Sequence, residues 1–417
     1  MRSVAALVGL VLASHGCGFQ SGATPDAGGG GGGGGESGIP VPAPEAGVPL
    51  PDTGLPDIPL DACVTFSGQL NTCLIPLTDD VVLDGKDITY NTETHKLVVG
   101  DAETSVAFKT LSTRGKEVDA IVAHNVRITA ESVLRVTGSR PFAIVASGTI
   151  TIEHAALVDV GNGGAGALMT CSTPAGSGDN NGGGGGGGGG GAYSADGGDG
   201  GKGNGDAMFP ATPSKGGSGA GSIGTPAGPQ GGCAGAPGGN GNLPGGMGGV
   251  GGRGGGVLYL VAAGGIELGE ASVLDAGGGG GSGGANEGGN GDAGGGGGGS
   301  GGMILLEAPR IAGPRAQVAA NGGGGGEGSS DSQAGHPGAR GLSTAARAPG
   351  GNGGPDNGAD GGRGGSKGAL VGETVMEVQN GGGGGGGGGV GFILIVSPDI
   401  DLGTMSPGAV SPALVRL

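Results

Sequence analysis

Residues 143–161, AIVASGTITIEHAALVDVG, decide the fold because their pattern returns along the chain. Three short runs rich in β-branched and apolar residues are separated by two turns, which is typical of a strand-turn-strand-turn-strand unit. Similar segments read AIVAHNVRITAESVLRVTG from Ala120, LYLVAAGGIELGEASVLDAGG from Leu258, ILLEAPRIAGPRAQVAANGG from Ile304 and ILIVSPDIDLGTMSPGAV from Ile393. Such self-similarity predicts a repeat architecture.

The middle strand of the repeat alternates apolar and polar residues, as in Ile150-Thr151-Ile152 and Ile266-Glu267-Leu268. This period of two places one side of the strand in a core and the other in water. A single repeat is too short to bury a face alone, whereas stacked repeats form a continuous apolar column. We therefore predict an all-β fold of parallel β-helix or solenoid-like coils, aligned at Val126, Ile150, Ile266, Ile311 and Ile400.

Glycine accounts for 118 of the 417 residues, and the chain has no Trp, which excludes an ordinary globular enzyme of this length. A collagen triple helix is also excluded, because glycine does not occupy every third position throughout. Most of the glycine lies in three inserts between the predicted coils, at residues 161–256, 277–302 and 322–391.

Two interpretations of the inserts stay open at the level of sequence. Glycine loses much conformational entropy on ordering and has no side chain to bury, which favours disorder. Alternatively, the inserts pack against one another as polyglycine II helices, which have three residues per turn. The segment 245–256, GGMGGVGGRGGG, has this period of three, and GGNGGP repeats it from Gly350.

The N-terminus has the features of an export signal. Arg2 precedes an apolar run at residues 4–13, and small residues precede Cys17. Gly16-Cys17 resembles the end of a bacterial lipobox, whereas Ser14 and His15 depart from it, so we expect either lipidation at Cys17 or ordinary signal cleavage nearby. Residues 18–62 read as a disordered acidic Gly/Pro-rich tether, residues 63–160 as a β-rich region with the first two coils, and residues 161–417 as the glycine-rich solenoid.

Four cysteines remain beyond Cys17, an even number that suits an oxidising compartment. The simplest pairing is local, Cys63 with Cys73 and Cys171 with Cys233. Metal binding by these cysteines is disfavoured, because no CxxC pair or histidine cluster accompanies them.

The formal charge of −17 disfavours binding to nucleic acid. We predict no cofactor and no catalytic residue. The charged residues of the coils are expected to be single, solvated groups on different coils: Arg127, Glu153, Asp159, Glu267 and Asp275. The histidines His95, His124, His154 and His336 are expected to be solvated turn residues. Acidic glycine-rich segments around Asp196, Asp199, Asp206, Asp356 and Asp360 resemble calcium-binding RTX repeats without their apolar anchor, so we expect them to be solubilising groups.

The phrases PFAIVASGTITI, GGCAGAPGG, VLYLVAAGGIEL and SGGMILLEAPRI together resemble a family of glycine-rich exported proteins of myxobacteria and their relatives, described as PE-PGRS-like by composition. The resemblance covers most of the chain from about Cys63 onward. It implies a surface or outer-membrane lipoprotein without an assigned activity, and the sequence lacks the PE domain of the mycobacterial proteins. The glycine-rich domain of certain receptor-kinase ectodomains is a more distant architectural analogue.

These observations favour a non-enzymatic, exported lipoprotein of the cell surface or outer membrane, otherwise a secreted protein. We expect it to contact the membrane through a lipid anchor and to act in adhesion, extracellular matrix or polysaccharide contact, or envelope structure. The alternative is a secreted β-helix enzyme acting on carbohydrate, a polysaccharide lyase or hydrolase, which would need carboxylates gathered on one face.

Overall fold

The structure is a computed structural model that describes residues 79–408, apart from residue 114 and the stretches 181–183, 205–212, 242–245, 287–290, 331–332, 354–357 and 377–380. The described residues all belong to one compact unit, Ile58–Leu417. They form eighteen strands and no helix, which confirms the predicted all-β class. The predicted signal, the tether and the residues Cys17, Cys63 and Cys73 lie outside the described residues.

Most strands are of three kinds that follow one another along the chain. Strands of the first kind are β6 (Lys116–Ala123), β9 (Phe142–Ala146), β12 (Val257–Ala262), β15 (Met303–Glu307) and β17 (Phe392–Val396). Those of the second kind are β1 (Val81–Leu83), β7 (Val126–Ile128), β10 (Thr149–Ile152) and β13 (Gly265–Leu268). Those of the third kind are β2 (Ile88–Asn91), β8 (Val133–Thr137), β11 (Leu157–Asp159) and β14 (Val273–Asp275). The long strands β16 (Arg310–Ala319) and β18 (Asp399–Ser406) each supply both a second and a third strand, and β3 (Lys96–Val99), β4 (Ala102–Thr104) and β5 (Phe108–Thr113) complete the set.

Strands of one kind pair with each other in parallel and in register, and so make three ladders. In the second ladder, successive partners are Val81, Val126, Ile150, Ile266, Ile311 and Ile400. Five of these are the residues that the sequence repeat aligned, so the predicted register is confirmed. Val81 adds one earlier layer that the sequence comparison missed. We call the three ladders together the β stack.

The three ladders enclose one apolar core. Ile144 of the first ladder, Ile150 of the second and Val158 of the third are all fully buried in the same cluster. Along the middle strand, Val126 and Ile128 are buried whereas Arg127 between them is exposed, which is the alternation that a half-buried strand requires. Equivalent residues of successive layers thus lie above one another, and the core continues from one layer to the next.

Hydrogen bonds join the strands into two sheets and do not close them into one tube among the described residues. The five first-kind strands and β5 form a six-stranded sheet, and the others form a twelve-stranded sheet. The centre of the six-stranded sheet is covered on both faces, since β9, β12 and β15 are buried along their whole length. Its outer face contacts Tyr193 from the first glycine-rich segment, whose ring meets Phe392 edge-on at 4.9 Å.

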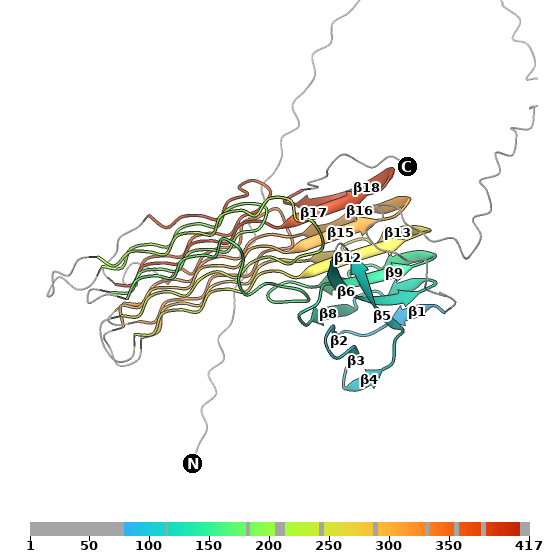
Figure 1. The fold of residues 1–417 in the computed structure, drawn as a ribbon, viewed down its shortest axis with the longest axis horizontal. Coiled ribbons are helices and arrows are strands. Elements are labelled where there is room, and N and C mark those ends of the chain that lie inside the picture. The colour runs from blue at the N-terminus through green and yellow to red at the C-terminus, as the bar shows by residue number, and fades with distance from the viewer. Residues whose placement is uncertain are drawn as a thin grey trace, which may run out of the picture. The chain divides into compact units, whose positions relative to one another are not determined.

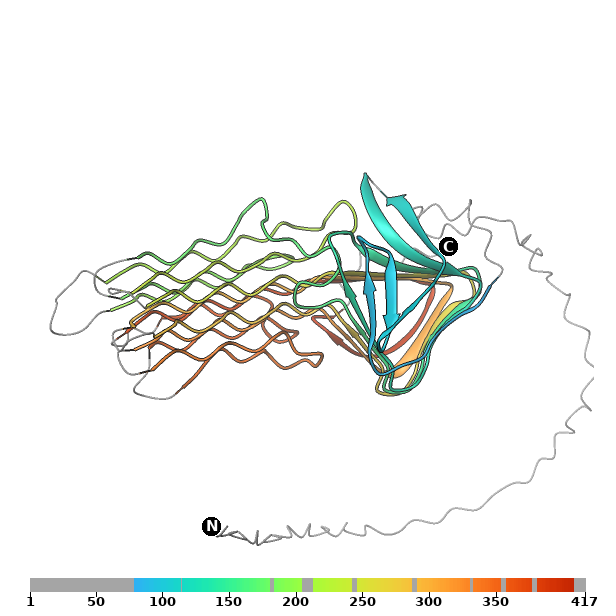
Figure 2. The same cartoon turned by 90° about the horizontal axis from the view of Figure 1, so that it is seen from below.

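The chain leaves the β stack at the same place in three layers. It departs after Asp159, Asp275 and Ala319 at the end of a third strand, and returns at Val257, Met303 and Phe392 at the start of a first strand. Figures 1 and 2 show the intervening segments as extended strands of chain running side by side and away from the β stack. Stacking of the layers therefore brings the glycine-rich segments together.

Residues 185–191 show how these segments hold one another. Gly185, Gly188 and Gly191 donate their backbone N–H to the carbonyls of residues 292, 295 and 298; Gly186 and Gly189 donate to 179 and 176; Gly187 and Gly190 donate to 201 and 198. The donors therefore address three different neighbours in turn, with a period of three residues. Three further neighbours, residues 383–389, 236–239 and 217–220, donate to the carbonyls of the same run.

Four runs lie at the centre of this arrangement: residues 184–191, 294–299, 322–326 and 381–389. All of their residues are buried, and each run is hydrogen-bonded to six neighbouring segments. We call these four runs, together with the segments that surround them, the glycine bundle. A Cβ atom at Gly187 would fall on the carbonyl oxygen of Gly384, and one at Gly297 on that of Gly189. Only glycine permits this approach, because a neighbour's carbonyl occupies the place of the side chain.

The surrounding segments tolerate a side chain at every third position. In residues 246–254, Met247, Val250 and Arg253 are exposed and the glycines between them are buried or half-buried. The period of three in the sequence thus marks the positions whose side chains are exposed on the outer segments. The uninterrupted glycine runs lie in the interior.

A disulfide joins Cys171 to Cys233 within the first glycine-rich segment, as predicted from their positions. Their Cα atoms are 5.8 Å apart, and the adjacent Leu168 pairs with Cys233 by backbone bonds. In the chain-entropy account, closing a loop of this length lowers the free energy of the folded state relative to the unfolded one by about 4 kcal/mol.

Replacing an interior glycine by alanine tests the packing of the bundle. We expect Gly187→Ala to lower the free energy of unfolding by about 1–3 kcal/mol, because the Cβ atom forces two backbones apart. The matched control is Gly368→Ala, since a Cβ atom there meets nothing within 4 Å. Urea unfolding of both variants gives the comparison, and equal stability of the two would contradict the packing.

Candidate functional site

A buried charged cluster lies where the chain leaves the β stack. Asp159 and Asp275 occupy the same register position in neighbouring layers, and Arg340 reaches both from the third glycine-rich segment. Its guanidinium donates to Asp159 at 2.9 and 3.1 Å and to Asp275 at 2.7 Å. Each carboxylate also accepts a backbone N–H two residues later, from Gly161 and Gly277.

The expectation that Asp159 and Asp275 are solvated was wrong. They are only 8% and 6% exposed, because both lie at the corner between the β stack and the glycine bundle, where the chain turns and Arg340 covers them. Arg340 was not singled out from the sequence, since it is distant in the chain and lies in a glycine-rich stretch without a motif. The cluster ties two layers to the bundle.

Burial is the largest influence on Asp275. It raises the pKa of this carboxyl from its ordinary value of 3.8 to about 6, although Arg340 and the Gly277 N–H act in the opposite direction. Asp159, one layer away, adds a second negative charge. The effect of burial on this pKa therefore exceeds the opposing effect of Arg340.

The outer face of the second ladder carries the other predicted charges. Arg127 donates to Glu153 at 2.6 Å, and the backbone N–H of Ala130 donates to the same carboxylate at 3.0 Å. The hydrogen bond from Arg127 lowers the pKa of Glu153, so this group stays ionised and is poorly suited to act as a general acid. Glu267 is exposed as predicted.

An open groove of about 710 Å³ lies on this face. Glu153, His154, Glu267 and Arg310 supply its charged or titratable groups, with Thr151 and Pro314 also at its wall. This groove brings together Glu153 and Glu267, two of the carboxylates that were considered in the sequence.

A second buried group joins Tyr90, His95 and Asp119 near the N-terminal end of the β stack. The hydroxyl of Tyr90 donates to Asp119 at 2.6 Å, and His95 Nδ1 lies 3.0 Å from the other carboxylate oxygen. The His95 ring also stacks on Phe108 with centroids 4.1 Å apart. Burial, followed by the hydrogen bond to Asp119, raises the pKa of Tyr90.

The expectation that His95 is a solvated turn residue was therefore wrong in part. It does lie in a turn, with a φ of 58°, but its side chain is covered by Asp119 and Phe108. His336 and His124 also have partners, Glu327 at 2.9 Å and Ser147 at 2.9 Å. These contacts fix loops to their neighbours.

The candidate calcium segments lie at the surface of the glycine bundle. Asp196 and Asp199 each accept a backbone N–H from an adjacent segment, from Ser222 at 2.6 Å and from Gly219 at 2.7 Å. Asp360 binds Asn352 at 2.7 Å, and Asp206 and Asp356 lie outside the described residues. Within the part of the chain that the structure describes, no three His, Cys, Asp or Glu side chains gather as a metal site.

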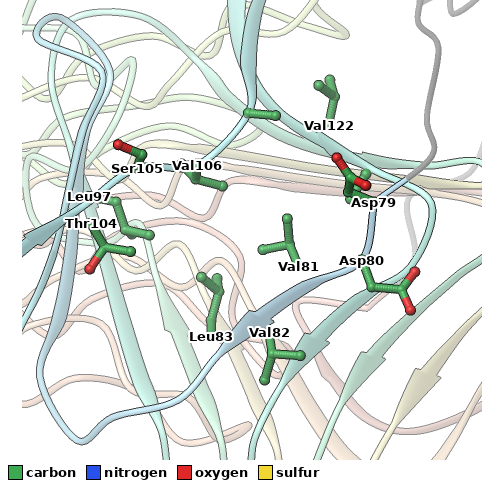
Figure 3. A pocket seen from close by; sticks show the side chains of 12 residues that line it. Asp79, Asp80, Val81, Val82, Leu83, Leu97, Thr104, Ser105, Val106 and Val122 are labelled. Carbon is green, nitrogen blue, oxygen red and sulfur yellow. The ribbon is translucent and has the colours of Figure 1, made fainter.

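A groove of about 370 Å³ opens at the N-terminal end of the β stack. Val81 and Leu83 of β1 lie on one side of it, and Leu97 and Val106 on another (Figure 3). Asp79 and Asp80 stand at its rim beside β1. The groove is thus an opening at the end of the core, with apolar side chains in its wall and polar ones, Asp79, Asp80, Thr104 and Ser105, beside them.

The surface of the bundle displays side chains at regular intervals. Met247, Val250 and Arg253 follow one segment, and Asp196, Asp199 and Lys202 follow another. Met247, Val250 and Met376 are large apolar side chains that are 64, 69 and 87% exposed. The described residues thus present a mixed polar and apolar surface on segments that are hydrogen-bonded to their neighbours.

The residues described here include no helix of the length and apolarity that a membrane span requires. Comparison with protein-family models, curated proteins and solved structures finds no match to this chain.

Removing the Asp275 carboxyl tests the charged corner. The raised pKa means that the folded protein holds this proton more tightly than the unfolded chain, so the stabilisation from Asp275 is fully present below pH 3.8 and is lost as pH rises through about 6. Relative to Asp275→Asn, the wild-type free energy of unfolding should fall by up to about 3 kcal/mol from about pH 4 to pH 7. Urea titrations across this range measure it.

The exposed carboxylate Glu267 supplies the control for this prediction. The Glu267→Gln variant should follow the wild type across the same pH range, because its side chain is solvated. Parallel stability curves for the wild type and Asp275→Asn would contradict the raised pKa.

Proposed function

We propose that this chain is a non-enzymatic lipoprotein of the cell surface or outer membrane that acts in adhesion, matrix contact or envelope structure. In this proposal, lipid on Cys17 anchors the chain, and residues 18–62 hold the folded part away from the membrane. The β stack acts as a solenoid-like scaffold, and the glycine bundle projects from it. The bundle is the part that contacts extracellular matrix or polysaccharide.

The observation that carries the proposal is the hydrogen bonding of the four interior glycine runs. Donors that address three neighbours in turn, with a period of three residues, are what polyglycine II helices would make. This hydrogen bonding supports polyglycine II over disorder for the inserts. Such a bundle is stiff without a hydrophobic core, and it leaves every third residue of its outer segments free to meet a partner.

The parallel ladders support a solenoid-like scaffold. Equivalent residues repeat in register over successive layers, from Val81 to Ile400 in the second ladder. Such stacking transmits position along the stack, so inserts that leave from one corner stay aligned. This suits a protein whose task is to display a surface.

The ion pairs and hydrogen bonds of the buried and half-buried charged side chains support a non-enzymatic role. Asp159 and Asp275 are both held by Arg340, and Glu153 is held by Arg127. Asp119 is enclosed by Tyr90 and His95. General acid–base catalysis needs groups that exchange protons with a substrate, and these are occupied by structural partners.

A carbohydrate-active enzyme is the second candidate, and one observation favours it. The open groove of about 710 Å³ on the outer face of the second ladder brings Glu153, Glu267 and His154 to one surface. A glycosidase or lyase would place its acid and base on such a face. Glu153→Gln and Glu267→Gln separate the two candidates, because loss of polysaccharide cleavage in these variants would favour the enzyme.

Lipidation and exposure test the main proposal. In a Gram-negative host, the wild-type chain should incorporate labelled palmitate and be cleaved by protease added to intact cells. Cys17→Ser should lose the label and leave the membrane fraction, whereas Cys171→Ser should keep the label. A wild-type protein found in the periplasm without surface cleavage, labelled or not, would sink the proposal.

A further inference from the structure

The N-terminal end of the β stack is capped on two of its three ladders. Antiparallel β5 covers β6 of the first ladder, and antiparallel β3 covers β2 of the third, with β4 beyond it. The second ladder ends at β1, and no strand among the described residues pairs with the outer edge of β1. A stacked-layer protein needs its terminal layer covered, because that layer otherwise exposes the apolar core.

The uncovered place is the groove of Figure 3. Leu83 and Leu97 in its wall belong to the buried core, and Val81 and Val106 are partly buried against that core. The side chains that line it come from β1, from β3 and the turn after β4, and from the end of β6. The first two ladders and the antiparallel cover of the third therefore meet at this opening, and whatever fills it completes the end of the column.

We propose that residues 64–77 of this chain occupy the groove as its N-terminal cap. These residues, VTFSGQLNTCLIPL, include Val64, Phe66, Leu70, Leu74, Ile75 and Leu77. They precede Asp79 in the chain, and Asp79 itself lines the groove. An extended chain spans up to about 3.5 Å per residue. The few residues between Ile75 and Asp79 are therefore long enough for Leu74 and Ile75 to reach the groove.

Charge selects this segment over the rest of the preceding chain. Asp79 and Asp80 place two carboxylates at the rim of the groove. Residues 64–77 contain no acidic residue, whereas the tether before them is acidic and lacks basic residues. The tether would be repelled from the rim, and its large apolar side chains are more thinly spread along the chain. The C-terminal residues leave the stack at β18, in the layer most distant from β1 along the second ladder.

The pairing of Cys63 with Cys73 predicted from sequence fits this role. It would close residues 64–72 into a short covalent loop. The cap does not depend on the proposed function, since a secreted enzyme with the same β stack would need it equally.

Tryptophan fluorescence tests the cap, because the chain has no Trp of its own. Phe66→Trp in the full chain places a single reporter in the cap, and Leu60→Trp places one in the tether. We expect a blue-shifted emission for Phe66→Trp and a constant for quenching by acrylamide that is several-fold lower than that of Leu60→Trp. Equal quenching of the two variants would overturn the proposal.

A second change shows whether the groove is what shelters the reporter. Adding Val106→Asp to Phe66→Trp should raise its quenching constant toward that of Leu60→Trp, since a charge in the groove expels the apolar cap. Val250→Asp, at an exposed valine of the glycine bundle, is the matched control and should leave quenching unchanged. No effect of Val106→Asp in a folded protein, or protection that depends on protein concentration and so points to a second copy, would contradict the proposal.

Discussion

The structure depends on the approach of bare backbones at the centre of the glycine bundle. At Gly187 and Gly297 a neighbour's carbonyl oxygen stands where a side chain would begin. This approach lets each interior run exchange backbone hydrogen bonds with six neighbours. The gain per residue is small, because a net hydrogen bond contributes about 1 kcal/mol and ordering a residue costs about 1–2 kcal/mol. The bundle therefore needs an external frame.

The β stack provides that frame. Successive layers lie about 4.8 Å apart in a sheet, and the chain leaves from one corner in three layers. The inserts thus start side by side, and ordering one prepares the place of the next. Arg340 and the Cys171–Cys233 disulfide strengthen this attachment, the first by joining two layers to the third insert and the second by closing the first insert. The exposed residues of the outer segments recur at every third position.

Much of this organisation could be predicted from local patterns. The alternation around Ile150 and Ile266 placed five layers in their observed register, because the period of two fixes which side chains face the core.

Other features could not be predicted. The layer at Val81 was missed, since its strand is only three residues long and lies apart from any full copy of the repeat. The burial of Asp159 and Asp275 was not predicted, for another reason. It depends on Arg340, which the fold brings to them from 181 residues away in the case of Asp159, and no local pattern encodes that contact. His95 likewise meets Asp119 across the fold. The period of three in residues 246–254 was visible in the sequence, but which runs lie inside follows only from the packing of all the inserts together.

Amide hydrogen exchange, read peptide by peptide by mass spectrometry, tests the central claim most directly. Residues 184–191 and 381–389 donate to carbonyls of other segments and are buried, so their amides should exchange orders of magnitude more slowly than those of an unstructured peptide of the same sequence. They should also exchange more slowly than the amides of the outer segment around Met247 and Val250, whose side chains are exposed. Exchange of these glycine amides at the rate of an unfolded chain, while the strands of the β stack stay protected, would contradict the account.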